Sequence, residues 1–357
     1  MKRTGKQIVL VALFLAVAAG AGFAANASAA VRATIGSLVL GKPLRFKNLT
    51  IIPISMLSIS TAIPVATLDE ALKKGWLRIR EIDDGEVPRL ALDNRSGRTI
   101  FVMGGEIVTG GKQDRLIGSD ALIRPYARGT KIPVYCVEAG RWTETTSQFS
   151  TKQNLGTWAL RSNAQAGAPA AQENIWGEVD KVQDRAGARS ATGAYQDIYE
   201  DRSLNERLLA LEAGLKNMPR LAAGTVGAIC AVGGRILSMD AFADPSVFER
   251  LWPKILRASA LSAVTAAADE SSGETTRESA WQFVERLSDL RFSESRGVDL
   301  GVVLRSDSGS TTASALVHDG VVLHLSAFPV AETDRAWQQA PGFAPGLDDD
   351  DSRQGRE

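Results

Sequence analysis

The chain has 357 residues, 44% of them hydrophobic, with 41 Lys and Arg against 41 Asp and Glu. This balance does not favour a general polyanion binder, so no nucleic-acid partner is expected. The length and apolar content are sufficient for one large or two ordinary domains with buried cores.

The first residues have the pattern of a secretory signal peptide. Three cations in MKRTGKQ precede an uncharged apolar run at 8–23, and the string AANASAA follows. The Ala-Ser-Ala at 27–29 fits a cleavage site, so residues 1–29 are predicted to be removed. The protein is therefore expected to be exported, periplasmic or extracellular, with no stable membrane insertion after removal. A segment kept as a membrane anchor is the alternative.

Residues 31–160 are predicted to form a strand-rich lobe. Short β-rich runs bounded by Gly, Pro, Asn and Asp follow one another: ATIGSLVL, LTIIPIS, LRIREI, RLALDN, TIFVM, ALI and KIPVYCVE. One helix interrupts them. It begins at a capping box formed by Thr67 and Glu70, and Gly75 supplies a left-handed stop.

Residues 161–202 are rich in Ala, Gln, Ser and Gly and are predicted to connect two lobes. One helix is expected within this connector, over ENIWGEVDKVQDRAG. Ile175, Val179 and Val182 recur there at helical spacing, which predicts one apolar face.

Residues 203–330 are predicted to form a sheet flanked by helices. Tight hairpins are expected at Gly233-Gly234 and Asp319-Gly320, and Pro253 should kink or restart its helix. The predicted fold class is therefore α+β, with the strand-rich N-terminal lobe packed against a second lobe of antiparallel strands flanked by helices. Residues 331–357 carry four consecutive aspartates and no apolar periodicity, which indicates an acidic disordered tail.

The sequence contains two cysteines, Cys136 and Cys230, each in an apolar, strand-like run. In an oxidising compartment they could pair. The alternative is two buried thiols, because the geometry of a disulfide is demanding.

The stretch GGEIVTGGKQDR, residues 104–115, combines two glycine pairs with charged and amide side chains. A phosphate-binding loop is not supported, because Gln113 stands after Lys112 where a Ser or Thr would bind magnesium. The glycines instead allow a close backbone approach in a loop that delivers Glu106. A bulged hairpin whose polar groups cap the backbone is the alternative.

A second dense stretch is IPVYCVEAGRW, residues 132–142. Strand alternation places Glu138 on the same face as Ile132, Val134 and Cys136, which conflicts with an apolar face. Glu138 therefore lies past the core edge or is buried against a cation, for which the candidates are Arg141, Lys112 and Arg115.

Glu106 and Glu138 are the candidate catalytic residues. They could act as an acid/base pair, or they could form structural ion pairs with Arg115 and Arg141. The GxSxG pattern of common hydrolases is absent. His318 and His324 are expected on opposite faces of their hairpin, with His324 opposite Ala315.

The pattern therefore predicts no metal site, although a mixed ligand set drawn from Glu106, Glu138 and one His stays open. Neither a cofactor nor an oligomeric state follows from these motifs.

Together with GAICAVGGRILSMDAFADPSVFERLWPKIL, the two stretches resemble the ARG and rhodanese-phosphatase-superfamily-associated protein domain family, over about residues 47–328. The matching pattern is GE-x-x-x-GGKQ-x-R followed by PV-x-C-VE-x-GRW. The resemblance implies an α+β domain whose motif residues form one site, and it brings no established reaction. Asp114 stands where the family pattern has an amide, which puts a donor role there in doubt.

The favoured function is binding of a small polar or carbohydrate-like ligand at a site formed by both motifs. Arg115 and Arg141 would contact acceptors, Gln113 would add an amide and Trp142 would stack, beside Gly110, Gly111 and Lys112. One alternative is a hydrolase with Glu106 or Glu138 as general base. Another is a structural or partner-binding envelope protein with no ligand site.

Overall fold

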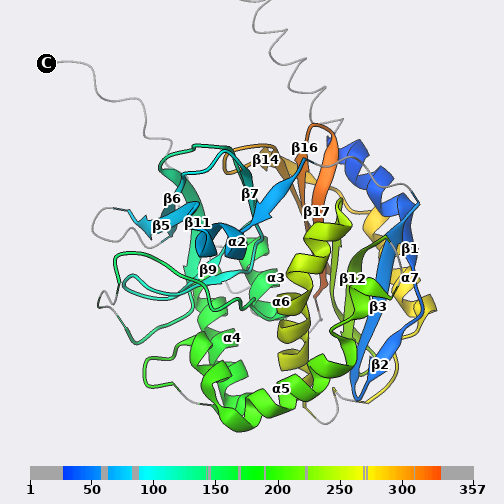
Figure 1. Ribbon diagram of the computed structural model, residues 1–357. Helices are drawn as coiled ribbons and strands as arrows, with labels where there is room; N and C mark the ends of the chain where they lie inside the picture. The colour runs from blue at the N-terminus through cyan, green and yellow to red at the C-terminus, as the bar shows by residue number, and fades with distance from the viewer. Residues whose placement is uncertain are drawn as a thin grey trace, which may run out of the picture.

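The computed structural model is drawn in Figure 1. It describes residues 27–57, 63–82, 88–141, 143, 146–167, 170–188, 190–221, 224–267, 270, 272–308 and 310–330. Trp142, residues 1–26 of the predicted signal peptide and the predicted tail at 331–357 lie outside these ranges. The fold is α+β, as predicted, and its described strands form three sheets.

The largest sheet has nine antiparallel strands and joins both ends of the described chain. Its order is β1-β3-β12-β13-β17-β16-β15-β14, with β2 beside β3. Strand β3 pairs with β12 from the second half of the chain, and β1 and β2 pair with β3, so none of the three pairs with the strands β4 to β11. The bounds are β1 Leu38–Leu40, β2 Leu44–Phe46, β3 Leu49–Met56, β12 Thr225–Val232, β13 Arg235–Phe242, β14 Ser293–Arg296, β15 Val302–Asp307, β16 Thr311–His318 and β17 Val321–Pro329.

Two smaller sheets contain the remaining strands, in the orders β5-β6-β11-β9-β8 and β10-β7-β4. The pairing of β9 with β11 places Arg115 opposite Cys136, so the two motif stretches lie side by side. The bounds are β4 Val65–Thr67, β5 Leu77–Glu81, β6 Arg89–Asn94, β7 Thr99–Val102, β8 Ile107–Val108, β9 Arg115–Ile117, β10 Ala121–Ile123 and β11 Thr130–Cys136.

Helices fill the space between the large sheet and the smaller sheets. Helix α6 lies there against β12, with α3 behind it and α5 alongside (Figure 1). The principal core forms around these helices. The bounds are α2 Leu68–Lys73, α3 Trp158–Ala166, α4 Ala171–Ala186, η1 Tyr195–Glu200, α5 Arg202–Leu215, η2 Met218–Arg220, α6 Pro245–Val264 and α7 Arg277–Ser288. None of the helices described here is both long and apolar enough to span a bilayer.

Local signals in the sequence agree with several elements. Thr67 and Glu70 form the expected capping box at α2. Both predicted hairpins are present, as β12–β13 and β16–β17. Helix α6 continues through Pro253 without a break in its assignment, so the proline does not restart it.

Two expectations about local structure were wrong. The run ATIGSLVL was predicted as a strand, but residues 27–37 are helical and only Leu38–Leu40 is extended. Ala27, Val31 and Ile35 recur every four residues and are all buried in the core cluster that contains α7, which explains the helix. The predicted connector was expected to contain one helix, but a second helix, α3, enters it before α4. Helix α4 is the expected one, and its Ile175, Val179 and Val182 are buried on one face.

Both cysteines are free and buried. Burial raises the pKa of both thiols, that of Cys230 to about 12, so neither should react readily in the native protein. We expect two titratable thiols per chain after denaturation without reductant and none rapidly before it. A thiol titration with and without denaturant measures this, and a denatured chain without free thiols would contradict the structure.

Candidate functional site

Glu106 lies in a buried ion-pair cluster that joins three separate segments. Its Oε1 is 2.5 Å from Nζ of Lys254 on α6, and the same Nζ is 2.5 Å from Asp69 on α2. The amide of Met103 donates to the other oxygen at 2.7 Å. Burial raises the pKa of Glu106 to about 7 despite the nearby cation. Glu106 therefore pairs with Lys254, and not with Arg115 as the sequence allowed.

The first glycine pair, Gly104 and Gly105, lets the backbone pass close to the side chains of Asp120 and Arg161. The amide of Gly104 donates to Oδ1 of Asp120 at 2.7 Å. Gly105 has φ of +96°, and a Cβ there would lie 2.5 Å from Cγ of Arg161. Only glycine combines this backbone conformation with so close an approach. These glycines therefore serve packing against Asp120 and Arg161.

A second buried cluster contains Asp120, Arg161, Asp240 and His324. Nδ1 of His324 is 2.7 Å from Asp120, and Nε2 is 3.1 Å from Asp240. Arg161 forms two hydrogen bonds to Asp240, at 3.0 and 2.5 Å. Burial disfavours the imidazolium, but Asp120 and Asp240 outweigh it and raise the pKa of His324 to about 9. The cluster is thus two cations balanced by two carboxylates.

Sequence reasoning missed this second cluster. His324 was predicted opposite Ala315, and no partner for its ring was predicted. A register shift between Leu316 and Val317 instead places His324 opposite Leu316. Among the described residues, no group of three or more His, Cys, Asp or Glu side chains is arranged to hold a metal ion.

Glu138 belongs to a third cluster, at the edge of the second motif. Arg141 donates to both its oxygens, at 2.8 and 2.6 Å, and the Thr192 hydroxyl donates at 2.8 Å. Burial opposes ionisation of Glu138, but these hydrogen bonds lower its pKa below the usual value. The expected pairing of Glu138 with Arg141 is therefore present.

Asp114 completes the third cluster as an acceptor. Its Oδ1 accepts from the Gly110 amide at 3.1 Å and lies 3.3 Å from Arg141. Burial raises its pKa to about 6. These contacts need only an acceptor, so an acid serves here although the resemblance led us to expect an amide.

The remaining residues of the first motif contact Glu81 on β5 and Arg141 of the second motif. Arg115 is fully buried, donates to Gln113 at 3.1 Å and has Nη2 3.6 Å from Glu81. The Lys112 amide also donates to Glu81, at 3.2 Å. The carbonyl of Gly111 accepts from Arg141 at 2.8 Å. Both motifs thus meet through Arg141, whereas Glu106 and Arg115 pair with residues outside the motifs.

The buried motif clusters can fix the fold but are poorly placed for chemistry. Glu106 is 1% and Glu138 4% exposed, and each is paired with its own cation. Among the described residues, no hydrogen bond or ion pair joins one glutamate to the other. A general base must reach the proton that it removes, which sealed carboxylates cannot do without a rearrangement.

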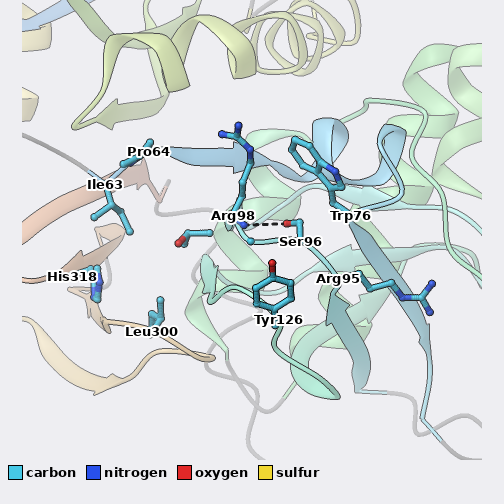
Figure 2. Close-up of a pocket in the computed structure, with 11 residues that line it drawn as sticks. Ile63, Pro64, Trp76, Arg95, Ser96, Arg98, Tyr126, Leu300 and His318 are labelled. Carbon is cyan, nitrogen blue, oxygen red and sulfur yellow. Dashed lines mark hydrogen bonds between the residues drawn. The ribbon is translucent and has the colours of Figure 1, made fainter.

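An open pocket lies where the smaller sheets meet the hairpin β16–β17 (Figure 2). Its volume is about 880 Å³. Trp76, Arg98 and Tyr126 stand on one side and His318 and Leu300 on the other. The lining residues are Ile63, Pro64, Trp76, Arg95, Ser96, Gly97, Arg98, Thr99, Tyr126, Leu300 and His318.

The loop that carries Arg98 is held by buried hydrogen bonds. Asn94 donates to the carbonyl of Arg98 at 2.7 Å and accepts from the Ser96 amide at 3.0 Å. The amide of Tyr126 donates to the Ser96 carbonyl at 3.1 Å. This pocket wall is therefore preorganised. The sequence showed only a polar turn, RSGR, and gave no signal that brings it to Tyr126.

The chain belongs to the ARG and rhodanese-phosphatase-superfamily-associated protein domain family (ARPP-1), whose model matches residues 37–328. No curated protein and no solved structure matches the chain. The family match confirms the resemblance seen in the motifs. It covers the three clusters and the pocket, and it assigns a function to none of them.

We expect His324→Gln to lower the free energy of unfolding by about 3 kcal/mol at pH 6, because it leaves two buried carboxylates with one cation. The pKa of His324 is raised from 6.5 to about 9, so its contribution is full below pH 6.5 and is lost as pH rises through 9. Urea denaturation across this range should show a decline that the variant lacks. His318→Gln is the control, and parallel profiles for wild type and His324→Gln would contradict the assignment.

We expect Glu138→Gln to cost about 2 kcal/mol of stability, because it weakens charge-assisted hydrogen bonds from Arg141 and Thr192. Glu178→Gln is a matched control, since Glu178 pairs with Lys181 near the surface and should contribute less than about 1 kcal/mol. Denaturant midpoints measure both changes. Equal costs would show that the third cluster is no stronger than a surface pair.

Proposed function

We propose that the protein binds a small, anionic, carbohydrate-like ligand in the pocket of Figure 2. The two motifs would hold the walls of this pocket instead of lining it. The observation that carries the proposal is an aromatic ring, Trp76, beside cations in a pocket whose described lining includes two arginines and no acid.

The aromatic side chains support recognition of a ring. Nζ of Lys74 lies 4.4 Å and the guanidinium of Arg98 5.4 Å from the Trp76 ring centroid. Tyr126 is 67% exposed and has φ of +59°, which is unusual for a bulky residue. Such strain costs on the order of 1–3 kcal/mol and is found most often at functional sites. Tyr126 offers an apolar face with a polar edge, and cations already lie over the Trp76 ring.

The charge of the pocket favours a carboxylate or similar anion on that ligand. Arg98 is exposed at the pocket, and a guanidinium binds a carboxylate through two parallel hydrogen bonds. The loop of residues 95–98 adds backbone groups to the pocket wall, and hydrogen bonds with Asn94 fix their positions. The volume of about 880 Å³ lies within the range of small-ligand sites. A sugar acid combines these features.

Direct binding at the motif residues and hydrolysis by Glu106 or Glu138 have less support. Their carboxylates are buried and paired, so a ligand would have to displace Lys254 or Arg141. A scaffold without any ligand stays the alternative outcome of the test below.

We expect glucuronate to bind more tightly than glucose, by about tenfold, because Arg98 pairs with the carboxylate. Arg98→Gln should remove this preference. Arg128→Gln is the matched control, since Arg128 is exposed near Tyr126 but does not line the pocket. Isothermal titration of the full chain with both sugars measures the affinities.

Loss of affinity in both arginine variants would indicate general charge attraction and contradict the pocket. No heat with either sugar would overturn the ligand proposal and favour the scaffold role.

A further inference from the structure

A second cleft lies away from the first pocket, between α4, the start of α3 and the β12–β13 hairpin. Its outer part has a volume of about 290 Å³, and a side chamber adds about 80 Å³. Both parts share Trp158, Glu178, Lys181, Arg185, Arg235 and Glu270. Because the same side chains line both, they form one continuous cleft.

The N-terminus of helix α3 opens into the side chamber. Thr157 is its N-cap residue, yet no side chain caps the helix. Thr157, Trp158 and Ala159 all line the chamber. The first amides of a helix lack intrahelical acceptors, and the helix dipole favours an anion beside them.

Buried polar atoms without partners provide independent evidence for a ligand. Thr157 is 3% exposed, and its hydroxyl has no hydrogen-bond partner in the described structure. Arg161 is 2% exposed, and its Nε also lacks one. It lines an inner chamber of about 10 Å³ that shares Trp158 and Leu237 with the side chamber. Buried polar groups usually have partners, so the Thr157 hydroxyl indicates that the side chamber receives a polar atom, whereas the chamber beside Arg161 is too small for a ligand.

The mouth of the cleft carries both signs of charge. Lys181 lies 2.5 Å from Glu178, and Arg185 lies 3.0 Å from Glu270. The Arg235 guanidinium stacks on the Trp158 ring at 4.7 Å. The charges of this rim are balanced, in contrast to the lining of the first pocket, which has two arginines and no acid. It fits a ligand that is itself polar along its length and carries one terminal charge.

We propose that this cleft binds the carboxyl-terminal end of a short peptide. The terminal carboxylate would lie at the N-terminus of α3, where the Thr157 hydroxyl donates to it. Asn163 and Asn174 line the outer part and can pair with peptide amides and carbonyls, since a side-chain amide donates and accepts. Trp158 would pack against a peptide side chain.

The test uses trialanine and trialaninamide, which differ only in the terminal carboxylate. Isothermal titration of the full chain should show at least about tenfold tighter binding of trialanine. Thr157→Val keeps the side-chain shape and removes the hydroxyl, so it should weaken trialanine and leave trialaninamide unchanged. Asn174→Ala should weaken both peptides, because it removes a contact to the peptide backbone.

Arg98→Gln, in the first pocket, is the control and should change neither affinity. Circular dichroism confirms that each variant is folded; if Thr157→Val is not, the peptide pair and Asn174→Ala still decide. Equal affinity of the two peptides, or no binding of either at millimolar concentration, would overturn the proposal.

Discussion

The burial of charge between segments distant in the sequence determines this structure. Removing an ion from water costs several kcal/mol unless a partner and hydrogen bonds replace the lost hydration. Lys254 meets Asp69 and Glu106 in one place, and His324 meets Asp120 in another. These partners come from opposite halves of the chain. The halves cannot shift apart without leaving buried charges without partners, which would be strongly destabilising.

The glycine-rich motif lies between two of these clusters. Gly104 binds Asp120, Gly105 packs on Arg161 and Glu106 pairs with Lys254. The same region supports the pocket, because β7 runs from the pocket edge at Thr99 to Val102 beside the motif. Strand β10 pairs with β7 and leads to the Tyr126 wall. The motif can therefore influence the geometry of the pocket without lining it.

Features set by a few adjacent residues were predictable from the sequence, and features set by topology were not. The capping box at Thr67 and the turn at Asp319-Gly320 depend on local backbone chemistry. The helix at 27–37 was misread because a short apolar run with β-branched residues fits either structure until its packing is known. Asp120 and His324 are 204 positions apart, so only the folded sheets make them neighbours. The two motif stretches lie side by side because β9 pairs with β11, but Lys254 had no local signal.

The proton content of the clusters follows from their charges. Two carboxylates share one cation both around Lys254 and around Arg141, and in each case burial raises the pKa of one acid, Glu106 to about 7 and Asp114 to about 6. The His324 cluster has two acids and two bases, and its charges balance because His324 keeps its second ring proton. A raised carboxyl pKa means that folding takes up a proton between about pH 4.5 and 7, so this contribution weakens as pH rises. His324 also makes the protein less stable as pH rises, between about pH 6.5 and 9. The interior therefore approaches neutrality by retaining protons, and its stability depends on conditions that keep them bound.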